Sequence, residues 1–463
     1  MLTIQTLKLL IYTLLIHVLI ACGGGEPQDN PESAKTAEDI GVEDNPASET
    51  RQWRDNVRLS AGIGPVTNPS LGMDAIGNGL AIWAQDNGDR HEVRARRFDV
   101  SNQAWSEEQV IDNGVQSAVK TAQHNNAKVK ESLQLAMASN GFAAVAWISE
   151  DTFSTKQQLW ANIYHPNNAQ WLGPTQITSD LEHDADYPVL SINETGEALI
   201  TWIQNGIAMS AYANDAWTSP IILDAVATST DSKLDNHGNI VITWASETVN
   251  AVTCVLGQAC DETVRLDALS STPVEPQLAI DGEGNAIVVW TQAVIDIMGL
   301  YSARLDAASS VWSSAELLDN TPSSACFITL DGNEQGVFVV AWTQSFNSSC
   351  ENTGRAIRAK IYTTPSGWFD TQEIDNLGGW GKRLGVDAQG NALLVWSNIH
   401  THWSHKPLTE RWLRAKKLAG ETDLSIRGFN DGDFNRIAVS MNSSALAIWR
   451  HNLRGGLYAQ HYQ

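Results

Sequence analysis

One phrase recurs eight times along the chain and constrains its fold more than any other feature. Its best copies read Asp-x-x-Gly-Asn-Ala-x-x-x-Trp and end at Trp290 and Trp396, while looser copies end at Trp83, Trp147, Trp202, Trp244, Trp342 and Trp449. Successive tryptophans of the series lie between 42 and 64 residues apart. A period near fifty residues with internal hydrophobic alternation is typical of a propeller or a solenoid. Packing explains most residues of such a scaffold, so function is expected where a copy departs from the repeat.

Each copy predicts four short strands. In the fifth copy, residues 276–280 form an alternating first strand, and 281–285 form a hairpin turn in which Asp bonds the backbone and Gly supplies a positive φ. The second strand runs to Trp290, a recurring alanine (here Ala303) marks the third, and a Trp-Ser pair begins the fourth over 312–318. Four strands per repeat with a buried tryptophan are typical of a propeller blade.

The two ends of the repeat region complement each other. The last copy stops after its third strand at Gln463, whereas residues 52–59 have the form of a fourth strand with no first three before it. Pairing of 52–59 with 457–463 would close a ring and cover both open edges. The sequence therefore predicts an all-β, eight-bladed β-propeller of four-stranded antiparallel blades, closed by an N-terminal outer strand. Seven blades is the alternative, because the copy ending at Trp147 follows the longest spacing.

Residues 1–21 are predicted to be a signal peptide rather than part of the fold. Lys8 precedes an apolar stretch over 9–20 that is too short to span a membrane. The following Leu19-Ile20-Ala21-Cys22 resembles the lipobox of bacterial lipoproteins, which implies that Cys22 is lipidated; a plain signal peptide with a nearby cysteine is the alternative. Gly23 differs from the Asp that resembles an inner-membrane retention signal, so the resemblance implies an outer-membrane anchor, on the periplasmic or the exposed side.

Charge and composition divide the rest of the chain. Residues 22–51 are predicted to be an acidic, disordered tether that starts at Cys22, and 52–463 are predicted to form the propeller. The formal net charge of the whole chain is −23, which argues against a nucleic-acid partner. We expect a monomer that meets the membrane through its lipid alone.

The four remaining cysteines are expected to pair, because an exported protein meets oxidising conditions. Cys254 replaces the repeating alanine of a third strand and Cys260 lies just beyond it, so a local bridge is predicted. Cys326 begins a first strand and Cys350 lies in a loop on the same rim, which predicts the second bridge.

The repeat broadly resembles the sialidase-type and Asp-box-like propellers. More closely, it resembles uncharacterised secreted bacterial repeat proteins that carry Gly-Asn-Ala-x-x-x-Trp followed by Trp-Ser, over residues 52–463. It departs from the Asp box, Ser-x-Asp-x-Gly-x-x-Trp, because Trp290 follows Gly284 by six positions. The resemblance implies the fold and no particular activity.

Long connections gather on one rim of the predicted propeller, at 112–130, 149–158, 343–355 and 397–411. Enlarged loops on one face of a rigid scaffold commonly carry binding residues. The candidate ligand-binding residues on this rim are Trp380, Arg383, His400, His402, Trp403, His405, Asp184 and Asp186.

Three of these candidates form a histidine cluster. His400, His402 and His405 could bind zinc or copper; the alternative is a polar loop that is rich in histidine, and no other cofactor is expected. The carboxylates have no evident catalytic partner and no Gly-x-Ser-x-Gly motif occurs. The sequence therefore predicts a protein that is not an enzyme but a binding scaffold for an envelope protein or glycan. The alternative is a glycan-active enzyme, a sialidase-like hydrolase or a lyase, at the same rim.

Overall fold

A computed structural model was obtained for the chain, which divides into two compact units, Met1–Thr50 and Arg51–Gln463. The structure describes residues of the second unit: 54–462, apart from 62–63, 89, 115–131, 151–155, 179–182, 268–270, 295–296, 346–353, 377–378, 399–407, 415–431, 440–443 and 452–455. None of the described residues belongs to a helix that could cross a membrane.

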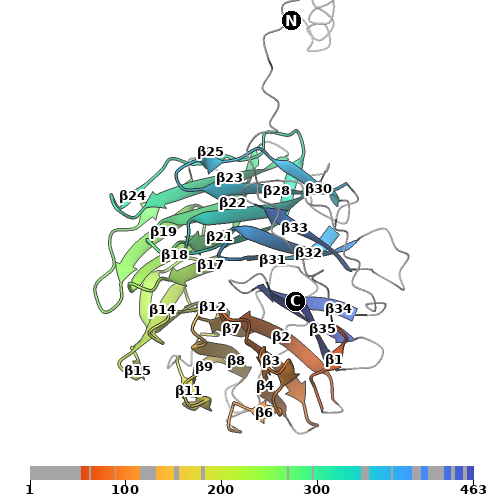
Figure 1. The fold of residues 1–463 in the computed structure, drawn as a ribbon. Helices are drawn as coiled ribbons and strands as arrows, with labels where there is room; N and C mark the ends of the chain where they lie inside the picture. Colours follow the sequence, from red (N-terminus) through yellow and green to blue (C-terminus); the bar gives the residue numbers. More distant parts are fainter. Residues whose placement is uncertain are drawn as a thin grey trace, which may run out of the picture. The chain divides into compact units, whose positions relative to one another are not determined.

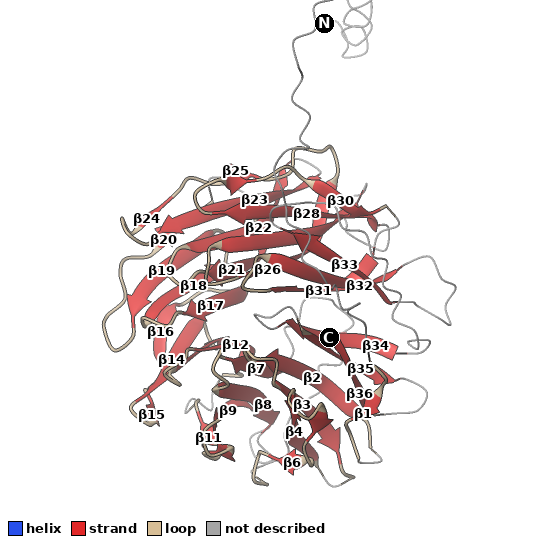
Figure 2. Cartoon of the chain, viewed as in Figure 1, coloured by secondary structure: helices blue, strands red, loops and turns tan. Residues whose placement is uncertain are grey.

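The described residues form strands and no helix, and the strands assemble into eight antiparallel sheets (Figures 1 and 2). The first four sheets are β2 (Val66–Met73), β3 (Gly79–Asp86), β4 (His91–Asp99), β5 (Ala104–Trp105) and β6 (Gln109–Val110); β7 (Leu133–Met137), β8 (Ala143–Glu150), β9 (Gln157–His165), β10 (Gln170–Trp171) and β11 (Thr175–Gln176); β12 (Asp186–Ile192), β13 (Ala198–Ile203), β14 (Ile207–Ala213), β15 (Ala216–Trp217) and β16 (Ile221–Asp224); and β17 (Ser229–Leu234), β18 (Asn239–Ala245), β19 (Val249–Val255) and β20 (Val264–Arg265). The other four are β21 (Pro273–Ile280), β22 (Ala286–Val294), β23 (Ile297–Asp306), β24 (Val311–Trp312) and β25 (Glu316–Leu317); β26 (Ser324–Gly332), β27 (Val337–Ser345), β28 (Gly354–Thr363), β29 (Gly367–Trp368) and β30 (Gln372–Asp375); β31 (Gly379–Val386), β32 (Asn391–Asn398) and β33 (Leu408–Arg414); and β34 (Gly432–Val439), β35 (Ala445–His451), β36 (Leu457–Tyr462) and β1 (Val57–Arg58).

The first strands of the eight sheets are neighbours in chain order. β2 contacts β7, and the series continues through β12, β17, β21, β26, β31 and β34, which contacts β2 again. We call these eight the inner strands. Their closed series gives every sheet a neighbour on each face, so its apolar side chains are buried between sheets.

The N-terminal strand closes the last sheet, as predicted. Val57 of β1 pairs with Ala459 of β36, and Arg58 pairs with Tyr458. The pairing is continued by hydrogen bonds from the Leu59 amide to the Leu457 carbonyl (2.7 Å) and from the Arg54 amide to the His461 carbonyl (2.9 Å).

The repeated Asp and Asn make one turn together. Asp281 Oδ1 accepts hydrogen bonds from the amides of Glu283 (3.0 Å) and Asn285 (2.8 Å), and its Oδ2 accepts one from the Asn285 side chain (3.0 Å). Gly284 between them has a φ of +85°, a conformation that other residues rarely adopt. Asn285 Oδ1 then accepts the amide of Ala307 (3.0 Å), which joins the turn to the next hairpin of the sheet.

The repeated tryptophans pack between sheets, as predicted. All eight are 2% exposed or less. In four copies a glutamine two residues later accepts the indole N–H, as Gln292 does for Trp290 (3.1 Å) and Gln204 does for Trp202 (3.0 Å). The glutamine Nε2 in turn donates to a carbonyl of the connection before the sheet, as Gln204 does to His183 (2.8 Å). Each Trp-x-Gln therefore joins the second strand to the connection that leads into the sheet.

The fourth strand is split, which the sequence pattern does not predict. In the first sheet β5 pairs with the last two residues of β4, and β6 pairs with Arg94 and Ala95 in its middle. In the first and fifth sheets the Ser of the Trp-Ser pair lies at the break: Ser106 Oγ accepts the Arg97 amide (3.0 Å), and Ser313 Oγ accepts the Arg304 amide (3.0 Å). A hydroxyl that takes the place of a backbone carbonyl displaces the strand locally.

A disulfide joins Cys254 of β19 to Cys260, the local bridge expected from their positions. Cys326 of β26 is also disulfide-bonded, and its predicted partner Cys350 lies outside the described residues.

Candidate functional site

The inner strands are irregular near the end at which each one begins. Register shifts interrupt β2, β12, β21, β26, β31 and β34. β7 and β17 keep a regular register. This end of each inner strand follows the connection from the preceding sheet, so the bulges lie on the rim for which long loops are predicted. Bulges often occur beside active sites, where they redirect a side chain.

Four of these bulges place a non-glycine residue in the left-handed region. The φ angles are +47° at Asn68, +51° at Tyr187, +39° at Glu275 and +51° at Phe327. Such a conformation costs on the order of 1–3 kcal/mol and is concentrated at functional sites. The four residues occupy equivalent positions, six residues before the turn residue of their copy, yet they are an amide, a phenol, a carboxylate and a phenyl ring. We call these four the bulge residues.

A proline follows three of the bulge residues, in Asn68-Pro69, Tyr187-Pro188 and Glu275-Pro276. Proline has no amide hydrogen, and an inner strand has a free edge, so the residue costs no ladder hydrogen bond there. These X-Pro pairs near the start of a strand are a sequence signal for the bulges. The alignment of the repeats relied on other residues and did not use this signal.

Tyr187 and Glu275 are the two bulge residues with ionisable side chains. Burial, with the charges of Asp186 and Glu275, raises the pKa of the Tyr187 phenol above its usual value. The phenol therefore stays protonated at neutral pH beside two carboxylates. Its hydroxyl makes no hydrogen bond within the described part of the chain. Tyr187 and Glu275 belong to the third and fifth sheets, and β17 between them is regular and begins with the small residues Ser229 and Thr230.

The other two bulge residues differ in exposure and contacts. Asn68 donates from Nδ2 to Ser132 Oγ of the second sheet (2.9 Å). Phe327 is 44% exposed, which is unusual for a phenyl ring in an inner strand. Asn68 therefore links two sheets at this rim, whereas Phe327 offers an accessible aromatic ring.

Asp184 and Asp186, predicted as ligand contacts, each accept a backbone amide. Asp184 Oδ1 accepts the amide of Gln157 in the second sheet (2.9 Å). Asp186 Oδ1 accepts the amide of Tyr187 (2.9 Å) and so supports the bulge directly. Asp186 also contributes charge beside the Tyr187 phenol, and it belongs to the site through that effect.

Arg383 and Trp380 are on β31, where they bracket its register shift. This strand belongs to the seventh sheet, whereas Asp186 and Tyr187 belong to the third. His400, His402, Trp403 and His405 lie outside the described residues. Within the described ranges, no group of three His, Cys, Asp or Glu side chains could hold a metal ion.

The opposite end of the inner strands is bridged by hydrogen bonds between turns. The Glu194 amide donates to Asn236 Oδ1 (2.9 Å), and Asn236 Nδ2 donates to Glu334 Oε1 (2.9 Å). The Gly282 amide donates to the Glu334 carbonyl (3.1 Å). These contacts join the third, fourth, fifth and sixth sheets around a cavity of about 190 Å³. The bridged end is therefore less suited to an extended ligand than the end with the bulge residues.

Two carboxylates, those of Asp331 and Asp231, join neighbouring inner strands. Asp331 Oδ2 accepts the amide of Val386 on the next inner strand (2.9 Å). Burial raises the pKa of Asp331 to about 6, although Lys233 opposes the shift. Asp231 of the fourth sheet has the same role toward the fifth, since its Oδ2 accepts the Leu278 amide (3.0 Å). Both carboxylates cap the free edges of inner strands.

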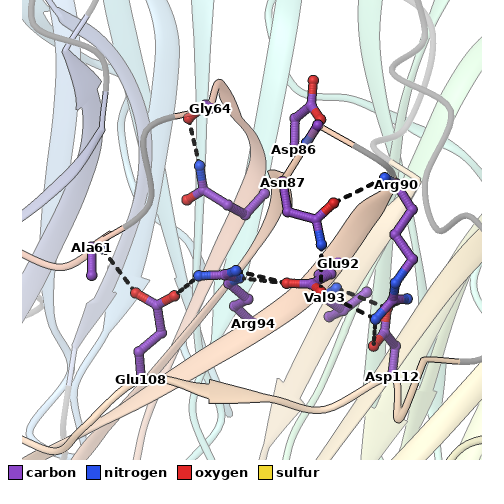
Figure 3. Close-up of polar contacts among 12 residues, drawn as sticks. Ala61, Gly64, Asp86, Asn87, Arg90, Glu92, Val93, Arg94, Glu108 and Asp112 are labelled. Carbon is purple, nitrogen blue, oxygen red and sulfur yellow. Dashed lines mark hydrogen bonds and ion pairs between the residues drawn. The ribbon is translucent and has the colours of Figure 1, made fainter.

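Two arginines of the first sheet, Arg90 and Arg94, form ion pairs (Figure 3). Arg90 pairs with Asp112 (3.0 Å) and with Glu92 (3.2 Å), and Arg94 pairs with Glu92 (2.7 Å) and with Glu108. Glu108 also accepts the Ala61 amide (2.9 Å) and so holds the segment after β1. This network links β4 to the segments on either side of it.

No family model and no curated protein matches the chain. Solved structures do match it. An ulvan lyase of a polysaccharide lyase family is 9% identical over 88% of this chain and 95% of its own, with a TM-score of 0.52. The Dos1 propeller is 9% identical over 89% of this chain and 95% of its own, with a TM-score of 0.51. An intramolecular trans-sialidase from Ruminococcus gnavus is 10% identical over 77% of this chain and 96% of its own, with a TM-score of 0.39.

These comparisons correct one prediction. The chain was predicted not to be an enzyme, because a repeat scaffold without an evident catalytic motif is typical of a binding protein. The ulvan lyase overturns that reasoning, since an enzyme matches most of this chain with the same fold. At such low identity the similarity shows the fold alone. The described part of the chain has the fold of a β-propeller, all-β and built of antiparallel sheets.

Proposed function

We propose that this protein is an envelope-anchored, eight-bladed propeller that binds a polysaccharide at the rim of the bulge residues and hydrolyses it there. The observation that carries the proposal is Tyr187, a strained and protonated phenol placed beside the carboxylates of Asp186 and Glu275. Strain at a position where the repeat itself needs no particular side chain is best explained by a functional role.

Three further features support a glycan as the ligand. The rim presents a phenol, a carboxylate and the exposed ring of Phe327, which together can bond sugar hydroxyls and pack on a sugar face. The net charge of −23 favours a neutral glycan over a polyanion. The bridged turns at the other end leave the rim as the favoured side of approach.

The geometry supports hydrolysis by an acid and a base. The Tyr187 hydroxyl donates its proton to the glycosidic oxygen as the bond from that oxygen to the anomeric carbon breaks. A water molecule attacks the anomeric carbon and gives its proton to the Glu275 carboxylate. The proton then returns from Glu275 to the phenolate, which restores both groups with one water consumed per bond.

The experiment is a glycan array combined with a turnover assay on the bound glycans. Tyr187→Phe and Glu275→Gln should each lower turnover by about 10²–10⁴-fold, the usual contribution of general acid–base catalysis. Tyr301→Phe is the matched control, because burial also raises the pKa of that phenol but it lies on the third strand of the fifth sheet. Binding without any product, or equal turnover in Tyr187→Phe and Tyr301→Phe, would overturn the proposal.

Two features of the sequence complete the proposed arrangement. Lipidation of Cys22 would anchor the chain at the outer membrane, and the acidic segment 22–51 would separate the propeller from the lipid. The eight described sheets and the closed series of inner strands support a count of eight blades.

A further inference from the structure

A groove runs between the outer parts of the second and third sheets, away from the bulge residues. Its volume is about 590 Å³, within the range of about 300–1,000 Å³ typical of small-ligand sites. The second sheet contributes Leu172 and the segment around Gln176, and the third contributes Tyr212, Asp215 and Trp217. The repeat places a tryptophan at the start of a fourth strand, and here that residue lines an open groove.

An aromatic wall forms the third-sheet side of this groove. The rings of Tyr212 and Trp217 lie 5.4 Å apart at an angle of 54°. Trp217 is partly exposed, unlike the buried Trp202 of the same sheet. Its indole N–H has no acceptor among the described residues. Leu172 faces the groove from the other sheet and is 52% exposed.

The polar groups of the groove have one sign of charge. Asp215 is exposed on the hairpin between β14 and β15, where its φ of +61° fits a tight turn. The Tyr212 hydroxyl donates to Asp215 Oδ1 (3.5 Å), and Asp215 Oδ2 has no partner in the described structure. No lysine, arginine or histidine lines the groove. An anionic sugar would therefore meet an uncompensated carboxylate, whereas a neutral sugar offers that carboxylate its hydroxyl donors.

We propose that this groove is a second glycan site, which binds an uncharged sugar residue stacked on Trp217 with its hydroxyls bonded to Asp215. The proposal rests on the proposed glycan class but not on catalysis at the rim. A polysaccharide held at both places gains affinity from the two contacts together, provided that it can span them.

The test uses the full chain and a printed array of neutral and uronate-containing oligosaccharides, followed by titration with the neutral oligosaccharide that binds best. Trp217→Ala should weaken that affinity by about tenfold or more, since a stacked ring supplies a large share of a small ligand's contact area. Asp215→Asn should also weaken it, and Trp217→Phe should keep most of it. The matched control is Trp105→Ala, because Trp105 has the same repeat position and packs on Phe98 at 5.3 Å.

Each outcome separates this site from the rim. Loss of binding in Trp217→Ala, with binding kept in Trp105→Ala, supports the groove. Equal affinities for Trp217→Ala and Trp105→Ala, binding of uronates alone, or no bound neutral oligosaccharide would overturn it. Groove binding in a protein without turnover would overturn the proposed hydrolysis and leave this site standing.

Discussion

The inner strands use one backbone conformation for unlike side chains. Asn68, Tyr187, Glu275 and Phe327 share a left-handed φ at equivalent positions, so the scaffold fixes where a side chain stands and leaves its chemistry free to vary. The capping carboxylates deeper in the strands are different, because they are required by the backbone edges they bond. Asp331 is the clearest of these.

Asp331→Asn tests whether this carboxyl group makes the free energy of unfolding depend on pH. The pKa of Asp331 rises from 3.8 to about 6 on folding, so the folded state holds its proton more tightly. Its contribution to stability is therefore fully present below pH 3.8 and is lost as the pH rises through about 6. The free energy of unfolding of the variant, relative to the parent, should increase by about 1–3 kcal/mol between pH 4 and pH 7. Denaturant unfolding at both pH values checks this, and a constant difference would contradict it.

The bulge residues show what one sequence can predict at this scale. The repeat identified the turn Asp and Asn and the buried tryptophans, because each recurs at a fixed position. Tyr187 and Glu275 occur once each at their position, so no pattern could mark them as a pair. Their proximity depends on β17, a regular strand that begins with small residues, and only the arrangement of the sheets reveals it.

Among the elements, β36 combines the closing of the last sheet with a buried histidine. His461 is 6% exposed, its ring packs on Phe98 at 4.8 Å, and both of its ring nitrogens lack hydrogen-bond partners in the described structure. Burial, together with the charge of Arg54, lowers the pKa of His461 to about 4. The strand that closes the sheet therefore contains a group that must remain neutral.

His461→Phe tests the effect of that group on acid stability. Since the pKa of His461 is 6.5 when unfolded and about 4 when folded, only the unfolded state takes up the proton as the pH falls between these values. Stability due to the neutral ring is present above pH 6.5 and is lost toward pH 4. The variant should have a smaller drop in melting temperature between pH 7 and pH 4.5 than the parent. An equal drop in the two proteins would show that His461 does not titrate in this way.

For the whole molecule, the sequence predicted the closure correctly but not the split of the fourth strands. The pairing of β1 with β36 could be predicted because residues 52–59 have the form of a fourth strand that lacks the first three strands of a copy. This feature is visible in any alignment of the repeats. The split fourth strands were missed because hydrophobic periodicity does not report a break in backbone pairing, such as the one beside Ser106, whose hydroxyl accepts a backbone amide. The predicted His400, His402 and His405 cluster stays a prediction.

Deleting residues 51–60 tests the closure. The deletion removes β1 and the fully buried Leu59, which should lower the free energy of unfolding by about 2–5 kcal/mol and broaden the thermal transition. Deleting 31–40 from the segment before the propeller is the control, and it should leave the transition unchanged. A body without 51–60 that melts like the control would disprove the closure.

Cys22→Ser tests the anchor. If Cys22 carries the lipid, the variant should leave the membrane fraction while its melting temperature stays that of the parent, because the cysteine lies outside the unit Arg51–Gln463. Fractionation followed by immunoblotting measures the first effect and calorimetry the second. Unchanged membrane attachment would contradict the lipoprotein prediction.

The pairing of β1 with β36 also has a kinetic consequence. The hydrogen bond from the Leu457 amide to Ser60 Oγ joins residues 397 positions apart. During synthesis β1 emerges before the other described strands, and β36 emerges after them. Contacts of such sequence separation form late, because the chain between them must be ordered first. The last sheet would thus remain incomplete until β36 has been synthesised, and a chain truncated before β36 could never complete it.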